Sequence, residues 1–514
     1  MSLETFRPEV YSKKHIVTSS SIFSSLSGNR ILNMGGNVAD AAISTSAVLC
    51  VVQNNLCGLG GDGFILGKIN DHMFVINGSG KSSHNASIDY FKNLGFDSIP
   101  KQGPMSAINV PGLVRSWIDL WKTYGSMDFK DLLKDAISLA EDGFPVTSSY
   151  IQSIRSSIPY SLDKEWIEAY NRGEMNPGDL FKQKKLSRTL RAISEDPYSF
   201  YEGNLADGIS KGFSQKGIIL DDYDLEKHSS LIQEPMSLQY EDVTVYETPP
   251  NSQGSTVLAW LDLYSNSEKK GIREFYKAGM EAMEYRRNFI GDPERENIDN
   301  GIVKNGNWRK IGRTNNGEVI GYKEKDDGDT TYFTIGDQNG QMISMIQSNY
   351  MGFGSLVMPT GMGFTLQNRG SYFSLDPNSR NCLEPEKRTF HTLSASIGLK
   401  DSEPFFSLGT MGGDVQPQIH ALLIDNLLNK MKAQRSIEAP RAVFPGTIYE
   451  RNDTLYYETG FKEIDRIRDL FQNVKELEYG NHMFGHSQMI IYLDSGVING
   501  GADLRGDGFA VPGV

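Results

Sequence analysis

A pair of threonines in the second half of the chain carries the groups that a self-activating hydrolase needs. Thr330 follows Gly328 and Asp329 and opens the run Thr-Thr-Tyr-Phe, whose residue types favour a buried strand. If the peptide bond between Asp329 and Thr330 is cut, Thr330 gains a free α-amine beside its hydroxyl nucleophile. That amine has a pKa of about 8, so it can act as the base that activates the hydroxyl. The alternative is that the pair only suits a strand, because so short a motif also arises by chance.

The segment before this pair has the composition of a loop. Residues 294–329 are rich in Asn, Gly, Asp, Glu, Lys and Arg and show little apolar periodicity. Such a segment cannot bury enough surface to offset the entropy of ordering it. We therefore expect a flexible segment that ends at the scissile bond, followed by a strand that holds the new terminus rigidly.

Bulk composition excludes several classes of function. The chain has 514 residues, 39% of them hydrophobic, which is ample for a large core. Its net charge of -13 argues against nucleic acid or an anionic membrane as a partner. No apolar run reaches the length of a membrane span, and the polar first 14 residues contain no signal-peptide core, so a cytoplasmic protein is expected.

The cysteines and histidines do not have the spacing of a metal site. Cys50, Cys57 and Cys382 are few and odd in number, and the eight histidines do not cluster. We expect reduced, inert thiols, no metal and no cofactor.

Hydrophobic periodicity predicts the elements that must position Thr330. Asn37 is a plausible N-cap for the first helix, with Asp40 three residues on. An Asn-Gly hairpin turn at 337–340 follows the threonine strand. The predicted helices are 38–52, two within 111–141, 255–264, 276–289 and 418–431, and the predicted strands are 64–69, 236–246, 331–336, 341–347, 405–408 and 488–493.

A glycine-rich turn matches the spacing of a dinucleotide-binding fingerprint at Gly58, Gly60 and Gly63. The fingerprint requires a strand before the glycines and a helix after them, and here the predicted order is reversed. We therefore interpret the turn as a tight backbone passage. A nucleotide-binding enzyme is the least supported of the alternatives.

Motifs in the same order along nearly the whole chain resemble the γ-glutamyltranspeptidase family of N-terminal nucleophile hydrolases. They are residues 35–42, 58–64, 110–112, 249–250, 291–293 and 502–508. The resemblance implies an α+β fold, the four-layer αββα sandwich. It also implies cleavage between Asp329 and Thr330 into a large-subunit region, 1–329, and a small-subunit region, 330–514, which together form one αββα unit.

The resemblance also assigns the catalytic groups. The nucleophile is the first threonine of the pair, Thr330, and Ser348 on the return strand contacts its amine. Backbone N–H groups of Gly412 and Gly413 would hold the oxyanion, since glycines let donors approach a developing charge closely. Taken alone, the glycine pair is better explained as an ordinary turn.

The residues that would recognise the substrate depart from the family pattern. Ser79 stands where the family has a carboxylate-binding arginine, and Tyr350 replaces an asparagine. Tyr372 replaces the aspartate that receives the substrate amine, and His391-Thr392 replaces a pair of serines. These changes spare the catalytic groups and point to the acylase-like branch of the family.

Asn368, Arg369 and Arg388 complete the predicted set of substrate-binding residues. Lys81, Arg369 or Arg388 could pair with a substrate carboxylate. For each of these three residues, a solvated side chain or a structural salt bridge explains the sequence about as well as substrate binding does.

The first hypothesis is an enzyme, autocleaved before Thr330, that acts on γ-glutamyl or related acyl amides through a threonyl acyl-enzyme, by hydrolysis rather than transfer. A glutaryl- or cephalosporin-acylase-like amidase is the related alternative. A hypothesis from another class is an unprocessed, non-catalytic homologue that acts as a binding protein. The expected partners are a small-molecule amide and the two fragments of the chain, with neither nucleic acid nor membrane; a homodimer is left open.

Overall fold

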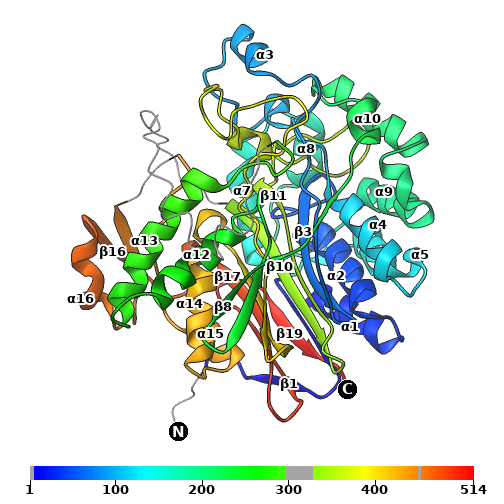
Figure 1. Cartoon of the computed structure of the whole chain (residues 1–514). Helices are drawn as coiled ribbons and strands as arrows, with labels where there is room; N and C mark the ends of the chain where they lie inside the picture. Colours follow the sequence, from blue (N-terminus) through cyan, green and yellow to red (C-terminus); the bar gives the residue numbers. More distant parts are fainter. Residues whose placement is uncertain (1–4, 296–327, 450–452) are drawn as a thin grey trace.

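Two antiparallel sheets stacked face to face form the centre of the molecule (Figure 1). The computed structural model describes residues 5–295, 328–449 and 453–514. The first seven-stranded sheet, here the β10 sheet, has the order β19 (Phe509–Pro512), β2 (His15–Ser19), β10 (Gly328–Asp337), β11 (Met342–Met351), β3 (Asp62–Ile69), β4 (His72–Asn77) and β7 (Leu231–Gln233). The second, here the β13 sheet, has the order β1 (Val10–Ser12), β18 (Ile498–Ala502), β17 (His486–Tyr492), β13 (Glu403–Met411), β12 (Ser396–Lys400), β9 (Val243–Glu247) and β8 (Met236–Tyr240).

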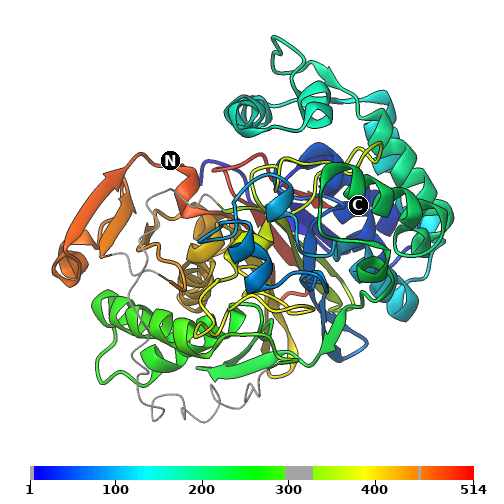
Figure 2. The same ribbon diagram turned by 90° about the horizontal axis from the view of Figure 1, so that it is seen from above.

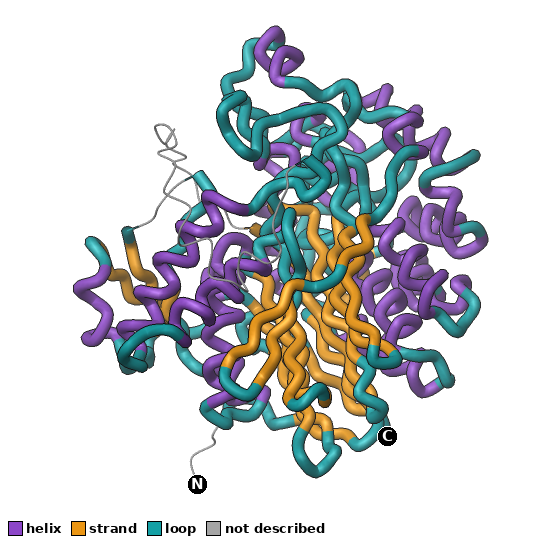
Figure 3. Tube along the Cα trace, viewed as in Figure 1, coloured by secondary structure: helices purple, strands orange, loops and turns teal. Residues whose placement is uncertain are grey.

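Helices cover the outer face of each sheet, which makes four layers (Figures 2 and 3). The helices against the β10 sheet are α1 (Ile22–Asn33), α2 (Val38–Val52) and α4 (Leu113–Tyr124). Those against the β13 sheet are α12 (Gly254–Ser265), α14 (Gln416–Leu428) and α15 (Ala433–Glu438), with α13 (Ile272–Phe289) packed on α12. The expected α+β fold, an αββα sandwich, is confirmed.

Shorter elements lie around this sandwich. The helices are α3 (Ile88–Asn93), α5 (Phe129–Leu132), α6 (Lys134–Asp142), α7 (Ser148–Ser157), α8 (Lys164–Tyr170), α9 (Lys184–Glu195), α10 (Asn204–Lys216), α11 (Asp222–Glu226) and α16 (Ile464–Ile467). A two-stranded sheet pairs β5 (Phe144–Pro145) with β6 (Leu180–Phe181). A three-stranded sheet has the order β14 (Ala442–Val443), β15 (Thr454–Glu458) and β16 (Asn473–Leu477). Within the described ranges, no helix has the length and apolarity needed to cross a membrane.

Helix α2 forms as its sequence predicts. The Asn37 side chain accepts from the backbone of Ala39 and Asp40, and the Asp40 carboxylate accepts from the Asn37 N–H, which completes a capping box. Every residue of α2 is buried, because its small side chains allow close packing on both sides. The closest approach is at Gly28 of α1, where a Cβ atom would lie 2.3 Å from the Thr45 hydroxyl.

Alternation along β10 decides which side chains lie between the sheets. Phe333 and Ile335 point into the core shared with the helices, whereas Tyr332 belongs to the core between the sheets. Thr334, which shares the face of Tyr332, contacts Ser407 of β13 with 2.5 Å between their hydroxyl oxygens. Since successive side chains of a strand alternate, Thr330 also faces the β13 sheet.

Several predicted elements differ from the structure. The predicted strand 236–246 is a hairpin, β8 and β9, because Glu241 takes a positive φ of 53° and reverses the chain. The second helix predicted within 111–141 is in fact two helices, α5 and α6, and the Asp128 side chain caps α5 by accepting from the Lys130 N–H. The threonine strand begins at Gly328 and its partner ends at Met351, so both are longer than predicted. Of the expected flexible segment 294–329, residues 296–327 lie outside the described residues.

The contact between Gly409 of β13 and Tyr332 of β10 sets the approach of the two sheets. A Cβ atom at Gly409 would lie 2.4 Å from the Tyr332 ring, so we expect Gly409→Ala to lower the free energy of unfolding by about 1–3 kcal/mol through overpacking. Urea denaturation measures this. Gly208→Ala on α10 is the matched control, because among the described residues it would crowd just one atom, at the end of the flexible Met362 side chain. Equal effects of the two substitutions would contradict the tight contact.

Candidate active site

Thr330 lies in β10 with its side chain only 1% exposed. Its hydroxyl donates to the Ser348 hydroxyl of β11 at 3.3 Å. The Ser348 oxygen also accepts the backbone N–H of Tyr350 at 2.7 Å, which fixes its position. The structure therefore brings together the predicted nucleophile and its predicted serine partner.

A β-bulge lies beside the predicted scissile bond. Asp329 pairs with Tyr350 and Thr331 pairs with Gln347, so Thr330 alone stands opposite Ser348 and Asn349. A bulge bends its strand and re-aims the side chains around it. Tyr350, just after the bulge, holds a positive φ of 81°, a strained conformation for a bulky residue that is often found at functional sites.

The glycine pair predicted to hold the oxyanion follows β13 at the level of Thr330. Between the sheets, Thr334 contacts Ser407 and Tyr332 packs on Gly409. Another step of two residues along each strand brings Thr330 level with Met411, directly before Gly412. Gly412 and Gly413 have φ angles of 136° and 55°, so this turn requires glycine.

A buried polar network holds the glycine turn. The Gln253 amide donates to the Gly413 carbonyl at 2.9 Å and to the Thr392 carbonyl. Arg286, fully buried on α13, donates to the Gln253 side-chain oxygen at 2.7 Å and to Asp414 at 2.8 Å. Sequence reasoning missed Arg286 and Gln253. Arg286 stands at a position of α13 where the pattern predicts an apolar residue, and this could have marked it as a buried, functionally important side chain.

Two of the predicted substrate-binding residues, Ser79 and Asn368, make hydrogen bonds within the protein. The Ser79 hydroxyl donates to Asn77 at 2.7 Å. The Asn368 side chain accepts from the Met351 N–H and donates to the Lys101 carbonyl. Their part in substrate binding stays a prediction.

His391 is held as a neutral ring. Burial lowers its pKa to about 4, helped by the charge of Arg369 and opposed by the hydrogen bond to Asp62. The tautomer that fits donates from Nε2 to the Asp62 carboxylate at 3.0 Å and accepts the Leu393 N–H at Nδ1. His391 therefore braces Asp62, and its role as a substrate contact also stays a prediction.

Arg388 and Lys81 share one carboxylate. Arg388 forms an ion pair with Glu294 and donates to the carbonyls of Ser79 and Ser229. Lys81 Nζ lies 3.1 Å from the same Glu294 oxygen, Oε2, and donates to Oε1 of that carboxylate at 3.2 Å. Both cations are thus used to tie together segments that are distant in sequence.

Arg369 has a different environment from these two cations. Its guanidinium lies 4.0 Å from the centre of the Tyr350 ring and donates to the Thr392 hydroxyl at 3.1 Å. The Tyr372 ring centre lies 6.0 Å from the same guanidinium, and the Tyr372 hydroxyl donates to the Asp414 carboxylate at 3.0 Å. Burial lowers the pKa of Arg369, yet a guanidinium stays charged at neutral pH.

Comparison with known proteins identifies the group to which this fold and site belong. The γ-glutamyltranspeptidase family model matches residues 24–513. The chain belongs to this family. It is therefore an enzyme, an N-terminal nucleophile amidohydrolase, and the expectations of family and enzyme class are confirmed.

Curated relatives carry several activities in their names. The chain is 36% identical to the glutathione hydrolase-like YwrD proenzyme of Bacillus subtilis, over 98% of this chain and 99% of the relative. It is 30% identical to the oxamate amidohydrolase proenzyme of Klebsiella pneumoniae, over 93% and 95% of the two chains. The crystal structure of a cephalosporin acylase from Bacillus halodurans superposes with a TM-score of 0.88 at 30% identity, covering 98% of this chain and 97% of the other.

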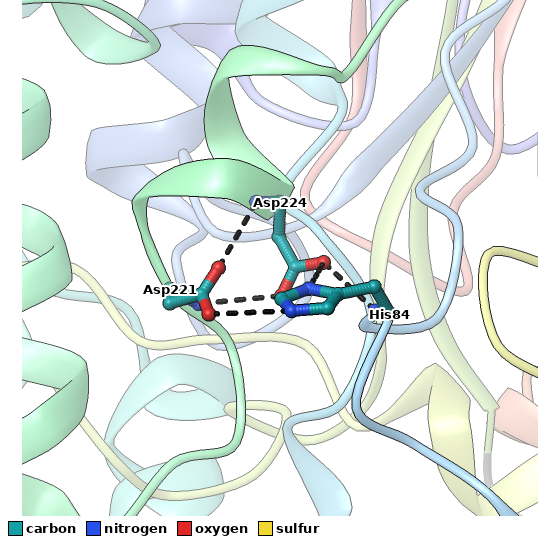
Figure 4. Close-up of side chains that lie close together, drawn as sticks. All are labelled: His84, Asp221 and Asp224. Carbon is teal, nitrogen blue, oxygen red and sulfur yellow. Dashed lines mark hydrogen bonds and ion pairs between the residues drawn. The ribbon is translucent and has the colours of Figure 1, made fainter.

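A second cluster of titratable side chains, His84, Asp221 and Asp224, lies at the start of α11 (Figure 4). His84 Nδ1 contacts the Asp224 carboxylate at 3.0 Å, and its other ring nitrogen lies 3.7 Å from Asp221. Both carboxylates already accept backbone N–H groups in the capping box of α11. The three residues thus form a satisfied cap that fastens the loop after β4 to this helix.

This cap should make stability depend on pH. The hydrogen bond to Asp224 raises the pKa of His84, so the pair stabilises the fold fully below the unfolded pKa of about 6.5 and loses its effect as pH rises through the folded pKa. We expect His84→Gln to cost more unfolding free energy at pH 5.5 than at pH 8.5, measured by urea denaturation. His72→Gln, whose ring contacts the Tyr124 hydroxyl, is the control. A loss independent of pH for His84→Gln would contradict the ion pair.

Proposed function

We propose that the chain cleaves itself before Thr330 and then hydrolyses small-molecule amides with Thr330 as the nucleophile. The 3.3 Å contact between the hydroxyls of Thr330 and Ser348, on adjacent strands of the β10 sheet, is the observation that carries the proposal. The names of the curated relatives, which call them proenzymes, support processing. The proposed products are a large fragment, 1–329, and a small fragment, 330–514.

Self-cleavage needs only groups on this chain and one water. The Thr330 hydroxyl attacks the carbonyl carbon of Asp329, and the C–N bond breaks as an ester forms at the threonine oxygen. The freed nitrogen becomes the α-amine of Thr330. Water then hydrolyses the ester, which leaves the Asp329 carboxylate and restores the hydroxyl.

The mature site would repeat this chemistry on a substrate. The α-amine takes the proton of the Thr330 hydroxyl as its oxygen attacks the amide carbonyl, and the N–H groups of Gly412 and Gly413 stabilise the oxyanion. Collapse of the oxyanion expels the substrate's amine, which leaves with that proton. Water, deprotonated by the α-amine, then releases the acid and returns Thr330 to its starting state.

Hydrolysis of an acyl amide is favoured over transfer of a γ-glutamyl group. The family residues that would bind an amino-acid head group appear here as Ser79 and Tyr372. The hydroxyl of Ser79 is turned to Asn77, and that of Tyr372 to Asp414. Neither residue can supply a charge to pair with the carboxylate or the ammonium of such a head group. The acyl group of the substrate is therefore what has to be identified.

Removing the nucleophile should abolish processing and hydrolysis together. We expect Thr330→Ala to remain a single chain and to lose amidase activity by at least about 10³-fold. Denaturing gels and N-terminal sequencing check this, with a wild-type small fragment that starts Thr-Thr-Tyr-Phe.

Thr331→Val is the matched control for that experiment. Thr331 alternates to the helical face of β10, and valine has nearly the same shape, so this variant should still be cut. An active wild-type chain that stays uncut, or a Thr330→Ala chain cut at the same bond, would sink the mechanism.

Loosening the glycine turn should slow the chemical step. Gln253→Met keeps the side-chain volume but removes the hydrogen bond to the Gly413 carbonyl. We expect kcat per mature site to fall by about 10- to 100-fold with a smaller change in KM. The oxyanion donors stabilise the transition state, so displacing them slows the chemical step more than it weakens substrate binding. Steady-state kinetics normalised to the amount of small fragment measures this, with the exposed Gln239→Met as control. An unchanged kcat would argue against Gln253 as a positioning residue.

A further inference from the structure

Arg369 is a buried cation with donors that the described part of the chain does not use. Its side chain is 1% exposed. One nitrogen donates to Thr392, but Nε and the other terminal nitrogen have no hydrogen-bond partner among the described residues. A buried charge with open donors is costly unless something pairs with it, and a guanidinium presents such donors in a fork that fits a carboxylate.

Short contacts connect Arg369 to both halves of the catalytic site. On the nucleophile side, its guanidinium lies over Tyr350, whose backbone N–H is bonded to Ser348. On the oxyanion side, it donates to Thr392, whose carbonyl accepts the same Gln253 amide that holds Gly413. Arg369 is therefore linked through Tyr350 to the serine partner of Thr330, and through Thr392 to the amide that holds Gly413.

Neither of the other two candidate cations is open in this way. Arg388 is committed to Ser79, Ser229 and Glu294, and Lys81 is paired with the same glutamate. Nothing in the sequence favours one of Lys81, Arg369 and Arg388 over the others as the cation that binds a substrate, whereas the structure favours Arg369.

The surroundings of Arg369 do not suit an ammonium group. The charges of Asp62 and Asp414 raise the pKa of Arg369 against the larger effect of burial, so both carboxylates are near it. Asp62 accepts from Gly80, Gln367 and His391, and Asp414 accepts from Arg286 and Tyr372. An α-ammonium here would have to compete with these donors and would also lie near the positive charge of Arg369.

We propose that Arg369 binds a carboxylate at the far end of the acyl group, so that the preferred substrates are monoamides of short dicarboxylic acids without an α-amine. The inference rests on the proposed function of Thr330 and adds the class of acyl group. Tyr350 and Thr392 act as positioning residues that hold the guanidinium in place.

Matched anilides test the proposal on processed enzyme. The probes are succinyl- and glutaryl-p-nitroanilide, their methyl esters, and γ-glutamyl-p-nitroanilide. We expect kcat/KM to favour each free acid over its ester by at least about 30-fold, and glutaryl to exceed γ-glutamyl. Arg369→Gln should lower kcat/KM for the acids by about 30- to 1,000-fold and change that for the esters by less than about threefold. Arg369→Lys should recover part of the loss.

Arg388→Gln is the control for the loss of a buried arginine. It should change acid and ester hydrolysis in parallel, because a structural defect does not alter their ratio. Calorimetric binding of glutarate to processed wild type, lost in Arg369→Gln, provides a readout that does not need turnover.

The outcomes separate the two proposals. Thr330-dependent hydrolysis with no acid preference, or an acid preference that survives Arg369→Gln, overturns the role of Arg369 and leaves the nucleophile standing. Absence of both acid-selective hydrolysis and glutarate binding also overturns it. Hydrolysis that persists in Thr330→Ala overturns the proposed function itself.

Discussion

The facing of β10 and β13 is the constraint on which the rest of the site depends. Side chains that alternate along β10 meet β13 at Ser407 and Gly409, and this register brings Thr330 level with the residue before Gly412. A slip of one residue would turn Thr330 towards the helices and bring Thr331 between the sheets. The bulge opposite Thr330 involves Ser348 and Asn349, and the pairing resumes at Thr331 with Gln347. The proposed nucleophile and the glycine turn proposed to hold the oxyanion are thus positioned by the packing of the two sheets.

The sequence predicted most elements near the site because local patterns decide them. The capping box at Asn37, the Asn-Gly turn after Asp337 and the alternation after Thr330 need no distant contact to be recognised. Short edge strands such as β1 and β19 were missed, because the few residues of each are held by partners far away in the chain. The hairpin at Glu241 was merged into one strand, since nothing in the pattern marks its positive φ.

The site was predicted less completely than the fold, and for a physical reason. Residue types show which groups can titrate or donate, but not which of them are already engaged. Arg388, Lys81 and Arg369 look alike in a sequence, yet Glu294 occupies the first two. Gln253 holds the backbone carbonyl of Gly413, and Arg286 holds Gln253. No sequence motif marks residues that support a site in this indirect way. The pairing of buried charges is a property of tertiary structure, so it appears only when the fold is known.

Strands from both sides of the scissile bond are interleaved in the β10 sheet. Strands β10 and β11 lie between β2 and β3, which precede the bond, and β19 closes the far edge beyond β2. The β13 sheet also combines strands from both sides of the proposed scissile bond, because β9, which precedes it, pairs with β12, which follows it. The proposed cut before Thr330 would therefore release no domain and would turn one folding molecule into two chains that depend on each other. Refolding of the cleaved protein would be bimolecular and dependent on concentration, so its lifetime would rest on slow unfolding rather than on reversible refolding.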